Sequence, residues 1–222
     1  DPDSKKASDL ELNEIIGLIE KSERPVLYIG GGIISADASE ALRKLVDATG
    51  IPVTSTVMGL GAFPETHKLS LRWLGMHGSA YSNWAVSGEF EKDADGNPVK
   101  IADGADLLLA FGVRFDDRVT GKVEKFCEHG TIVHIDIDPS EINNIRKVAL
   151  TVVSDVKYAL ERLSEMVTER PLQNNFDKWQ KQVAAWKEKA PFGYRVTEEV
   201  IQSQHMKDHL SGSESEVILS LI

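Results

Sequence analysis

The feature that most constrains the fold is an apolar run that ends abruptly in a charged loop. Residues 107–111 read Leu-Leu-Leu-Ala-Phe, Gly112 follows, and the next six residues carry four charges. A strand buried on both faces of a parallel sheet reads as a continuous apolar run, and its polar loop emerges at the carboxyl edge. That edge is where open α/β sheets bind ligands. The segment therefore predicts a central parallel strand that delivers a ligand-binding loop.

Four charged residues stand within five positions of this loop: Arg114, Asp116, Asp117 and Arg118. Loop charges are often only solvated, and that reading stays open for each of them. Glycines on both sides allow the backbone to approach a ligand closely, and paired arginines and carboxylates bind polar groups strongly. We therefore expect the loop to position a ligand.

Helical and strand periodicities alternate along the chain. Strands are predicted at about 25–29, 52–56, 106–111, 131–137 and 150–153. Helices are predicted at about 9–22, 38–49 and 79–86, and after Asp155. Ser8 and Glu11 form a capping box for the first of these, Gly50 ends the second, and Asp155 is the N-cap of the last. The region between residues 58 and 74 reads as mostly loop. This alternation predicts an α/β fold, a doubly wound parallel sheet with helices on both faces in three α/β/α layers.

Two segments fall outside this alternation. Residues 87–100 are polar and rich in turn formers, so we expect an exposed insertion, with a hairpin turning at 95–97. Its aspartates resemble a calcium loop, but no glutamate stands at the twelfth position. The helical stretch with Phe176, Trp179 and Trp186 is expected to be a linker. We therefore divide the chain into a domain at 1–170, a linker helix at 171–195 and the beginning of another domain at 196–222.

Composition excludes some classes of partner. The chain has 222 residues, of which 41% are hydrophobic, and a net charge of -10. This charge repels phosphate backbones and anionic lipid surfaces, so we expect no nucleic-acid or membrane partner. One cysteine, Cys127, cannot form an internal disulfide, and we expect a cytoplasmic protein. The first residue is Asp1 and the last residues are apolar, so we expect a piece of a longer chain.

A glycine turn after the first strand is a candidate phosphate site. Gly30, Gly31 and Gly32 follow residues 25–29 and precede a helical segment. Such glycines also serve turn geometry alone, so this motif by itself is weak. An ordinary nicotinamide site requires an acid about twenty residues later, and the second strand ends instead in Thr54-Ser55-Thr56. Acids appear only at later strand ends, at Asp136 and Asp155, so a bound dinucleotide should place a ribose there.

No nucleophilic or metal site can be assigned. His77 has no serine or cysteine that the sequence places as its catalytic partner, and Cys127 is expected to pack inside a helix. His205 and His209 have helical spacing but lack the intervening glutamate of a zinc helix. We therefore predict no metal ligand and no catalytic residue in this chain.

Four segments resemble the central domain of acetolactate synthase, also called acetohydroxyacid synthase. They occur in the same order at sensible spacing between about residues 24 and 157: 54–61 (TSTVMGLG), 74–78 (LGMHG), 111–122 (FGVRFDDRVTGK) and 133–138 (VHIDID). Members of this family condense two pyruvates, or pyruvate with 2-oxobutyrate, on thiamine diphosphate and Mg²⁺ in branched-chain amino-acid synthesis. Their central domain carries an FAD with no net redox role. The resemblance thus implies FAD in this domain.

The resemblance also implies roles for individual residues. Those that match flavin-contacting positions are Gly31, Thr56, Val57, Leu74, Gly75, Met76, His77, Gly112, Val113, Arg114, Phe115 and Asp116. Asp136, Ile137, Asp155 and Val156 match positions at the adenosine end. Asp117 and Arg118 match positions that line the substrate channel, where inhibitors of the family bind.

The same resemblance places the thiamine machinery elsewhere. The activating glutamate belongs to an amino-terminal domain, and the Gly-Asp-Gly motif for Mg²⁺ and the diphosphate belongs to a carboxyl-terminal domain that residues 196–222 would only begin. We expect the chain alone to be inactive, and the complete enzyme to be a homodimer or homotetramer, with a possible regulatory small subunit. Two alternatives remain. One is a nonenzymatic FAD module like that of an electron-transfer flavoprotein, and the other is another thiamine enzyme such as glyoxylate carboligase or an oxidase.

Overall fold

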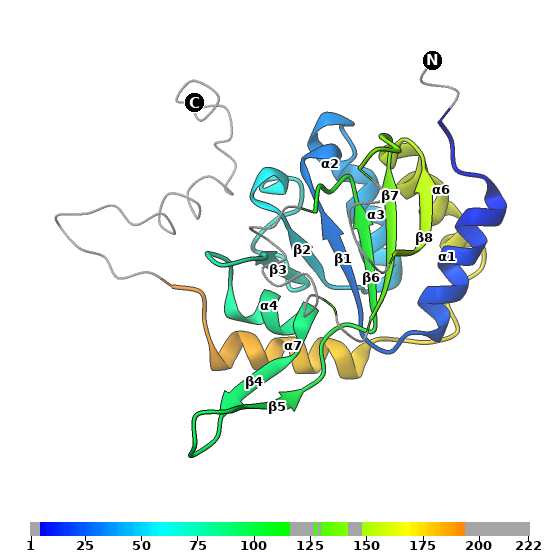
Figure 1. Ribbon diagram of the computed structural model, residues 1–222. Coiled ribbons are helices and arrows are strands. Elements are labelled where there is room, and N and C mark those ends of the chain that lie inside the picture. Colours follow the sequence, from blue (N-terminus) through cyan, green and yellow to red (C-terminus); the bar gives the residue numbers. More distant parts are fainter. Residues whose placement is uncertain (1–4, 116–126, 128–129, 142–147, 194–222) are drawn as a thin grey trace, which may run out of the picture.

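A computed structural model provides the structure and describes residues 5–115, 127, 130–141 and 148–193 (Figure 1). Its centre is a six-stranded sheet in the order β3-β2-β1-β6-β7-β8. The strands are β1 (Pro25–Ile29), β2 (Val53–Ser55), β3 (Ser70–Trp73), β6 (Leu107–Phe111), β7 (Thr131–Asp136) and β8 (Val148–Val153). Every neighbouring pair in this sheet is parallel. The predicted doubly wound α/β fold is confirmed.

The strand order reverses between β1 and β6. Leu27 pairs with Val53 of β2 on one side and with Leu109 of β6 on the other. All five residues of β1 and all five of β6 are buried, as their apolar sequences predict. The chain runs outward from β1 in both directions, and this creates a topological switch point at the carboxyl ends of these two strands.

Helices cover both faces of the sheet. On one face lie α1 (Asp9–Lys21), α3 (Ser39–Thr49) and α6 (Val156–Glu169), where α3 packs against α6 and α6 against α1 (Figure 1). The connection from β3 to β6 runs the opposite way along the sheet, so the right-handed crossover rule places its helix α4 (Ala80–Ser87) on the other face. These two layers bury the sheet.

The predicted helix ends are confirmed. The hydroxyl of Ser8 accepts from the Glu11 amide, while the Glu11 carboxylate accepts from the Ser8 amide, forming the expected capping box. Gly50 ends α3 in a left-handed conformation with φ of 72°. Asp155 caps α6 by accepting from the Tyr158 amide at 2.9 Å. Local sequence rules therefore determine where these helices begin and end.

The helix expected to be a linker, α7 (Asp177–Lys189), packs against this domain. It crosses below the amino ends of the strands in Figure 1, and Trp179, Val183 and Trp186 are buried. The indole of Trp179 donates to the carbonyl of Pro25, the first residue of β1, at 3.0 Å. These contacts attach α7 to the core, and the division of the chain at residues 170 and 195 stays a prediction.

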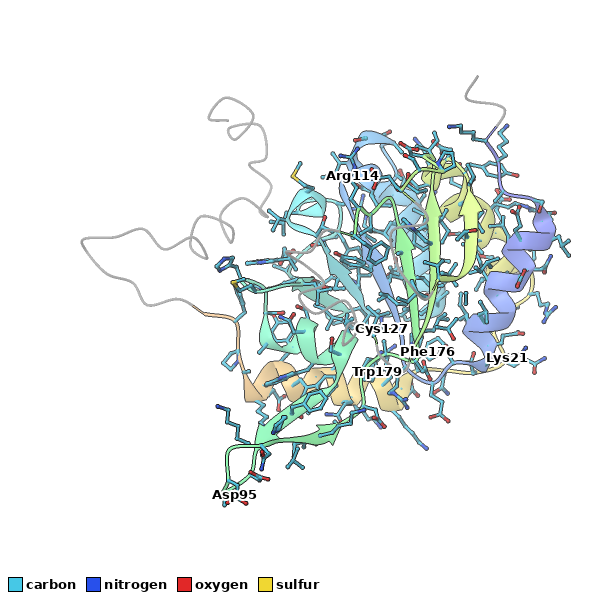
Figure 2. The ribbon with its side chains drawn as sticks, in the orientation of Figure 1. Lys21, Asp95, Arg114, Cys127, Phe176 and Trp179 are labelled. Atoms are coloured by element: carbon cyan, nitrogen blue, oxygen red, sulfur yellow. The ribbon has the colours of Figure 1, made fainter. Side chains whose placement is uncertain are left out.

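The insertion forms an antiparallel hairpin of β4 (Glu89–Lys92) and β5 (Pro98–Ala102), as expected. The hairpin projects from the body, with Asp95 at its tip (Figures 1 and 2). Its base is anchored because the buried carboxylate of Glu89 accepts from the Trp186 indole at 2.7 Å and pairs with Lys189. The hydrogen bond from the Lys189 ammonium group, with a smaller contribution from the Trp186 indole, lowers the pKa of Glu89.

Three local features differ from the sequence-based expectations. The region read as loop contains β3, a short edge strand whose sequence Ser-Leu-Arg-Trp lacks an apolar run. The glycine turn continues into a separate short helix, α2 (Gly31–Ser35), before α3 begins. Cys127 lies in a turn with φ of 48° rather than in a helix.

Two glycine loops meet at the switch point by direct backbone contact. The amide of Gly30 donates to the carbonyl of Phe111, and the amide of Gly32 donates to the carbonyl of Gly112, each at 3.1 Å. A Cβ on Gly32 would lie 2.7 Å from the Gly112 Cα, and Gly112 itself has φ of 58°. Only residues without side chains permit this approach.

No helix in the described part of the chain is both long enough and apolar enough to cross a membrane.

We expect Gly32→Ala to lower the free energy of unfolding by about 2 to 4 kcal/mol, because its methyl group would push against backbone that cannot rotate away. The matched control is Gly31→Ala, whose Cβ would lie 3.3 Å from both the Cβ and the carbonyl oxygen of Met58. These contacts are tight but lie well beyond the 2.7 Å overlap at Gly32, so we expect a loss below about 1 kcal/mol. Urea denaturation measures both, and equal losses would contradict the backbone-contact account.

Candidate functional site

The predicted site residues that the structure describes gather at the carboxyl edge of the sheet. They follow β1, β2, β3, β6, β7 and β8, so each strand supplies at least one of them. Neighbouring strands lie about 4.8 Å apart, and the edge is thus about 24 Å long. Asp116, Asp117 and Arg118 lie outside the described residues, and their roles stay predictions.

The loop after β6 is fixed at successive residues. The amide of Gly112 donates to the carbonyl of Ile135 on β7 at 3.0 Å, while the Gly112 carbonyl accepts from Gly32. Arg114 extends into solvent at this edge, where its guanidinium forms a 3.1 Å ion pair with Glu141 (Figure 2). The ring of Phe115 packs against Tyr28, with ring centroids 5.8 Å apart.

A buried histidine on β7, His134, contacts the backbone of the loop after β6. Nε2 of His134 lies 3.0 Å from the Val113 carbonyl, and Phe115 packs edge-on against the imidazole. Burial lowers the pKa of His134, so the ring is neutral at neutral pH and Nε2 donates its proton to the carbonyl. His134 therefore serves as a structural support for the loop.

The loop after β2 lies beside the glycine turn. The amide of Thr56 donates to the Ile29 carbonyl at 2.8 Å, and its hydroxyl accepts from the Gly59 amide at 3.1 Å. Residues Val57–Gly59 form a single turn, η2, that packs against α2. This packing leaves the side chains of Val57 and Met58 exposed beside Gly31.

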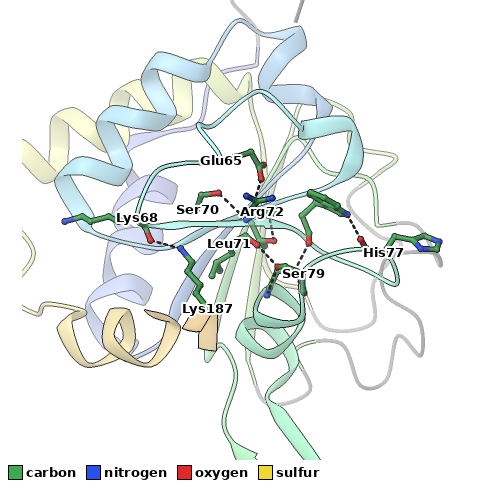
Figure 3. A network of polar contacts seen from close by, with 11 residues as sticks. Glu65, Lys68, Ser70, Leu71, Arg72, His77, Ser79 and Lys187 are labelled. Atoms are coloured by element: carbon green, nitrogen blue, oxygen red, sulfur yellow. Dashed lines mark hydrogen bonds and ion pairs between the residues drawn. The ribbon is translucent and has the colours of Figure 1, made fainter. Parts of the chain in front are cut away.

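The loop after β3 is held by side chains of α4 and β3. Asn83 accepts from the Gly75 amide at 3.2 Å and donates to the Gly75 carbonyl at 3.0 Å. The indole of Trp73 donates to the carbonyl of His77 at 3.0 Å, a contact drawn in Figure 3. The side chains of Met76 and His77 are left exposed.

The acidic end of the site lies over β7 and β8. Asp136 accepts from the amide of Asp138 at 2.9 Å, and its own carbonyl accepts from Ser154 next to Asp155. Lys5 donates to the carbonyl of Ile137 at 2.8 Å. Hydrogen bonds from Ser140 lower the pKa of Asp138, so this carboxylate is charged. Asp136 and Asp155 therefore stand at the carboxyl ends of the neighbouring strands β7 and β8.

Exposure divides the predicted residues into two groups. The side chains of Leu74, Val113 and Val156 are buried, so these residues can contact a ligand only through their backbone. Exposed apolar side chains come from five positions along the edge: Ile34, Val57, Met58, Met76 and Ile137. Apolar side chains suit a flat ring, and exposed glycine backbone suits a polar chain. The edge therefore suits a ligand in which a flat ring is joined to a polar chain.

Several functional candidates were missed by sequence reasoning: Trp73, Asn83, His134, Ile34, Met58 and Glu141. Asn83 stands four residues after the N-cap Ser79, which is the one local signal that could have placed it near the loop. His134 and Glu141 depend on the pairing of β6 with β7, Trp73 depends on a loop that folds back onto it, and Ile34 and Met58 were identified by their exposure. Sequence periodicity reveals none of these.

A hollow of about 510 Å³ lies at the opposite end of the sheet, between α7 and residues 22–24. Trp179 and Asn174 line it, and Figure 2 shows Trp179 far from Arg114. Within the described ranges, no three histidine, cysteine or acidic side chains converge in a way that could hold a metal ion.

The chain matches the family described as "Thiamine pyrophosphate enzyme, central domain" over residues 12–163. It is 44% identical to acetolactate synthase 1, chloroplastic, of Zea mays, over 87% of this chain and 28% of that protein. It is 46% identical to the probable acetolactate synthase 2, chloroplastic, of Oryza sativa subsp. japonica, over 87% of this chain and 27% of that protein. It is 42% identical to acetolactate synthase, chloroplastic, of Arabidopsis thaliana, over 90% of this chain and 28% of that protein. The chain thus spans less than a third of these relatives.

The expected cytoplasmic location is contradicted by these comparisons, since the relatives carry the word chloroplastic in their names. The expectation rested on the single cysteine and on the lack of an apolar stretch long enough for a membrane span or a secretory signal. These features are the same in every compartment that keeps thiols reduced, so they cannot distinguish the cytoplasm from another such compartment.

We expect the thiol of Cys127 to be unreactive in the folded chain. Burial raises its pKa to about 12, and the residue is 2% exposed. At pH 8 the thiolate fraction is then about a thousandfold smaller than for an ordinary thiol. Titration with a chromogenic disulfide should show no reaction until guanidinium is added and one thiol afterwards. Rapid reaction of the native chain would contradict the buried packing role.

Proposed function

Because the chain belongs to the thiamine pyrophosphate enzyme central-domain family, we propose that it is the central domain of an acetolactate synthase. The observation that carries the proposal is the identity of 42% to acetolactate synthase, chloroplastic, of Arabidopsis thaliana over 90% of this chain. The complete protein would condense two pyruvates, or pyruvate with 2-oxobutyrate. These are the substrates implied by the resemblance.

We propose that the carboxyl edge of the sheet binds FAD. The edge fits this group in two respects. Gly31 has no side chain at the switch point, so its backbone can approach a ligand closely, and a Cβ there would crowd the exposed Met58 beside it at 3.3 Å. Val57, Met58 and Met76 expose apolar surface on the same side, which suits an aromatic ring system.

The proposed orientation follows from the two ends of this edge. The flavin ring would lie near Thr56, Val57 and residues 74–77. Residues Gly112–Asp116 would line the same cofactor. The adenosine would lie near Asp136, Ile137 and Asp155. Each carboxylate already accepts one backbone amide through Oδ1, Asp155 from Tyr158 and Asp136 from Asp138, so either would accept from a ribose hydroxyl through its second oxygen. FAD would here be a structural group with no net redox role.

Thiamine diphosphate supplies the carbanion chemistry in this family, and the residues that bind it and Mg²⁺ would come from other domains. No Gly-Asp-Gly motif occurs in these 222 residues. We propose that this chain contributes Asp117 and Arg118 to the substrate channel, and that residues 196–222 begin the carboxyl-terminal domain. A homodimer or homotetramer and a regulatory small subunit remain part of the proposal.

FAD should bind the isolated chain in the micromolar to millimolar range, because neighbouring domains would supply part of the binding surface. Gly31→Ala should weaken binding about tenfold, since its methyl group would push on the exposed Met58 beside the proposed flavin position while the fold tolerates it. Gly17→Ala is the control, because a Cβ there has no neighbour within 4 Å. Flavin fluorescence measures all three proteins. A folded chain that binds no FAD at millimolar concentration would overturn the site.

The chain alone should form no acetolactate from pyruvate when thiamine diphosphate, Mg²⁺ and FAD are supplied. Activation of thiamine requires a positioned carboxylate and a metal site for its diphosphate, and neither is assigned to this chain. A colorimetric acetoin assay provides the measurement, with an intact acetolactate synthase as positive control. Turnover that persists through repurification would show that the chain holds its own thiamine site.

A further inference from the structure

The loop at residues 74–78, which we term the cofactor loop, depends on side chains for its shape. Asn83 binds both backbone groups of Gly75, and the Gly78 amide closes the loop by donating to the Gly75 carbonyl at 3.0 Å. The carbonyl of His77 receives the indole proton of Trp73. A Cβ on Gly78 would lie 2.2 Å from the Trp73 carbonyl, so the loop folds tightly over this tryptophan.

The same tryptophan is held by the segment that follows α7. The ring of Phe192 packs edge-on against Trp73, with centroids 4.7 Å apart, and the Arg72 guanidinium lies 4.8 Å from the Phe192 centroid. Lys187 at the end of α7 donates to the Lys68 carbonyl at 2.7 Å, which ties this end of the helix to the chain leading into β3 (Figure 3). A continuous set of contacts therefore runs from the carboxyl end of α7 through Phe192 and Trp73 to the cofactor loop, while Trp179 lies in the first turn of that helix.

From these contacts we infer that Trp73 is a positioning residue for the flavin contacts of the cofactor loop, and that Phe192 sets the position of Trp73. The inference rests on the proposed FAD site. Trp73 is 1% exposed and contacts the cofactor loop through the His77 carbonyl, so its effect on FAD is indirect. The consequence is that a change just after α7, outside the flavin site, alters flavin affinity.

Geometry separates this role from ordinary core packing. Trp73 and Trp179 are both buried, and each indole donates to a backbone carbonyl at 3.0 Å. Trp179 donates to Pro25, at the amino end of the sheet. Trp179→Phe is thus a matched control that removes the same kind of hydrogen bond away from the cofactor loop.

The test compares Trp73→Phe, Phe192→Leu and Trp179→Phe in the 222-residue chain. Amide hydrogen exchange at Gly75, Gly78 and Ser79 reports on the loop without any ligand, and FAD fluorescence titration reports on binding. Trp73→Phe should speed exchange at these amides and weaken FAD about three- to tenfold, as expected for one lost hydrogen bond. Phe192→Leu should act in the same direction. Trp179→Phe should leave both readouts unchanged even where its melting temperature falls.

Unchanged loop exchange in both Trp73→Phe and Phe192→Leu would overturn the inference, and so would equal acceleration in Trp179→Phe. Faster exchange with unchanged FAD affinity would overturn the positioning role alone. Failure of the unmodified chain to bind FAD would instead overturn the proposed site, and exchange would still report whether Trp73 orders the loop. If Trp73→Phe does not fold, Phe192→Leu decides between these results.

Discussion

The backbone contact between two glycine loops is the constraint on which the rest of the structure depends. Gly32 donates to Gly112 where the strand order reverses, and a side chain on Gly30 or Gly32 would overlap the backbone of Gly112. This approach joins β1 to β6 beyond their last ladder bonds and fixes the loop that carries Arg114. The position of the whole carboxyl edge follows from it, because every other loop of the site is built on neighbouring strands.

Each loop at this edge is then held by its own polar contacts. His134 holds Val113, Thr56 closes the turn after β2, and Asn83 holds Gly75. The backbone of these loops is thus largely satisfied within the protein, while apolar side chains such as Met58 and Met76 face outward. Pre-organisation of this kind lowers the entropy lost when a ligand binds. It supports the proposal of a structural cofactor, which needs a fixed surface rather than a catalytic group.

Sequence patterns predicted the fold well where burial on both faces leaves an unbroken apolar run, as in residues 107–111, and where caps are local, as at Ser8 and Asp155. They failed at β3, because an edge strand of four residues carrying Ser70 and Arg72 has no such run. Trp73 and His134 were missed because their partners lie across the sheet or in a folded-back loop. The location was predicted wrongly because composition does not identify a compartment.

In the proposed complex, FAD lies along the carboxyl edge of the sheet rather than in the hollow beside α7. The most direct measurement is a ¹H–¹⁵N correlation spectrum of the labelled chain titrated with FAD. We expect the largest shifts in the amides of Gly31, Val57, Met76, Gly112 and Ile137, with residues 22–24 and 174–179 unchanged. Shifts confined to residues 22–24 and 174–179 would contradict this placement of FAD.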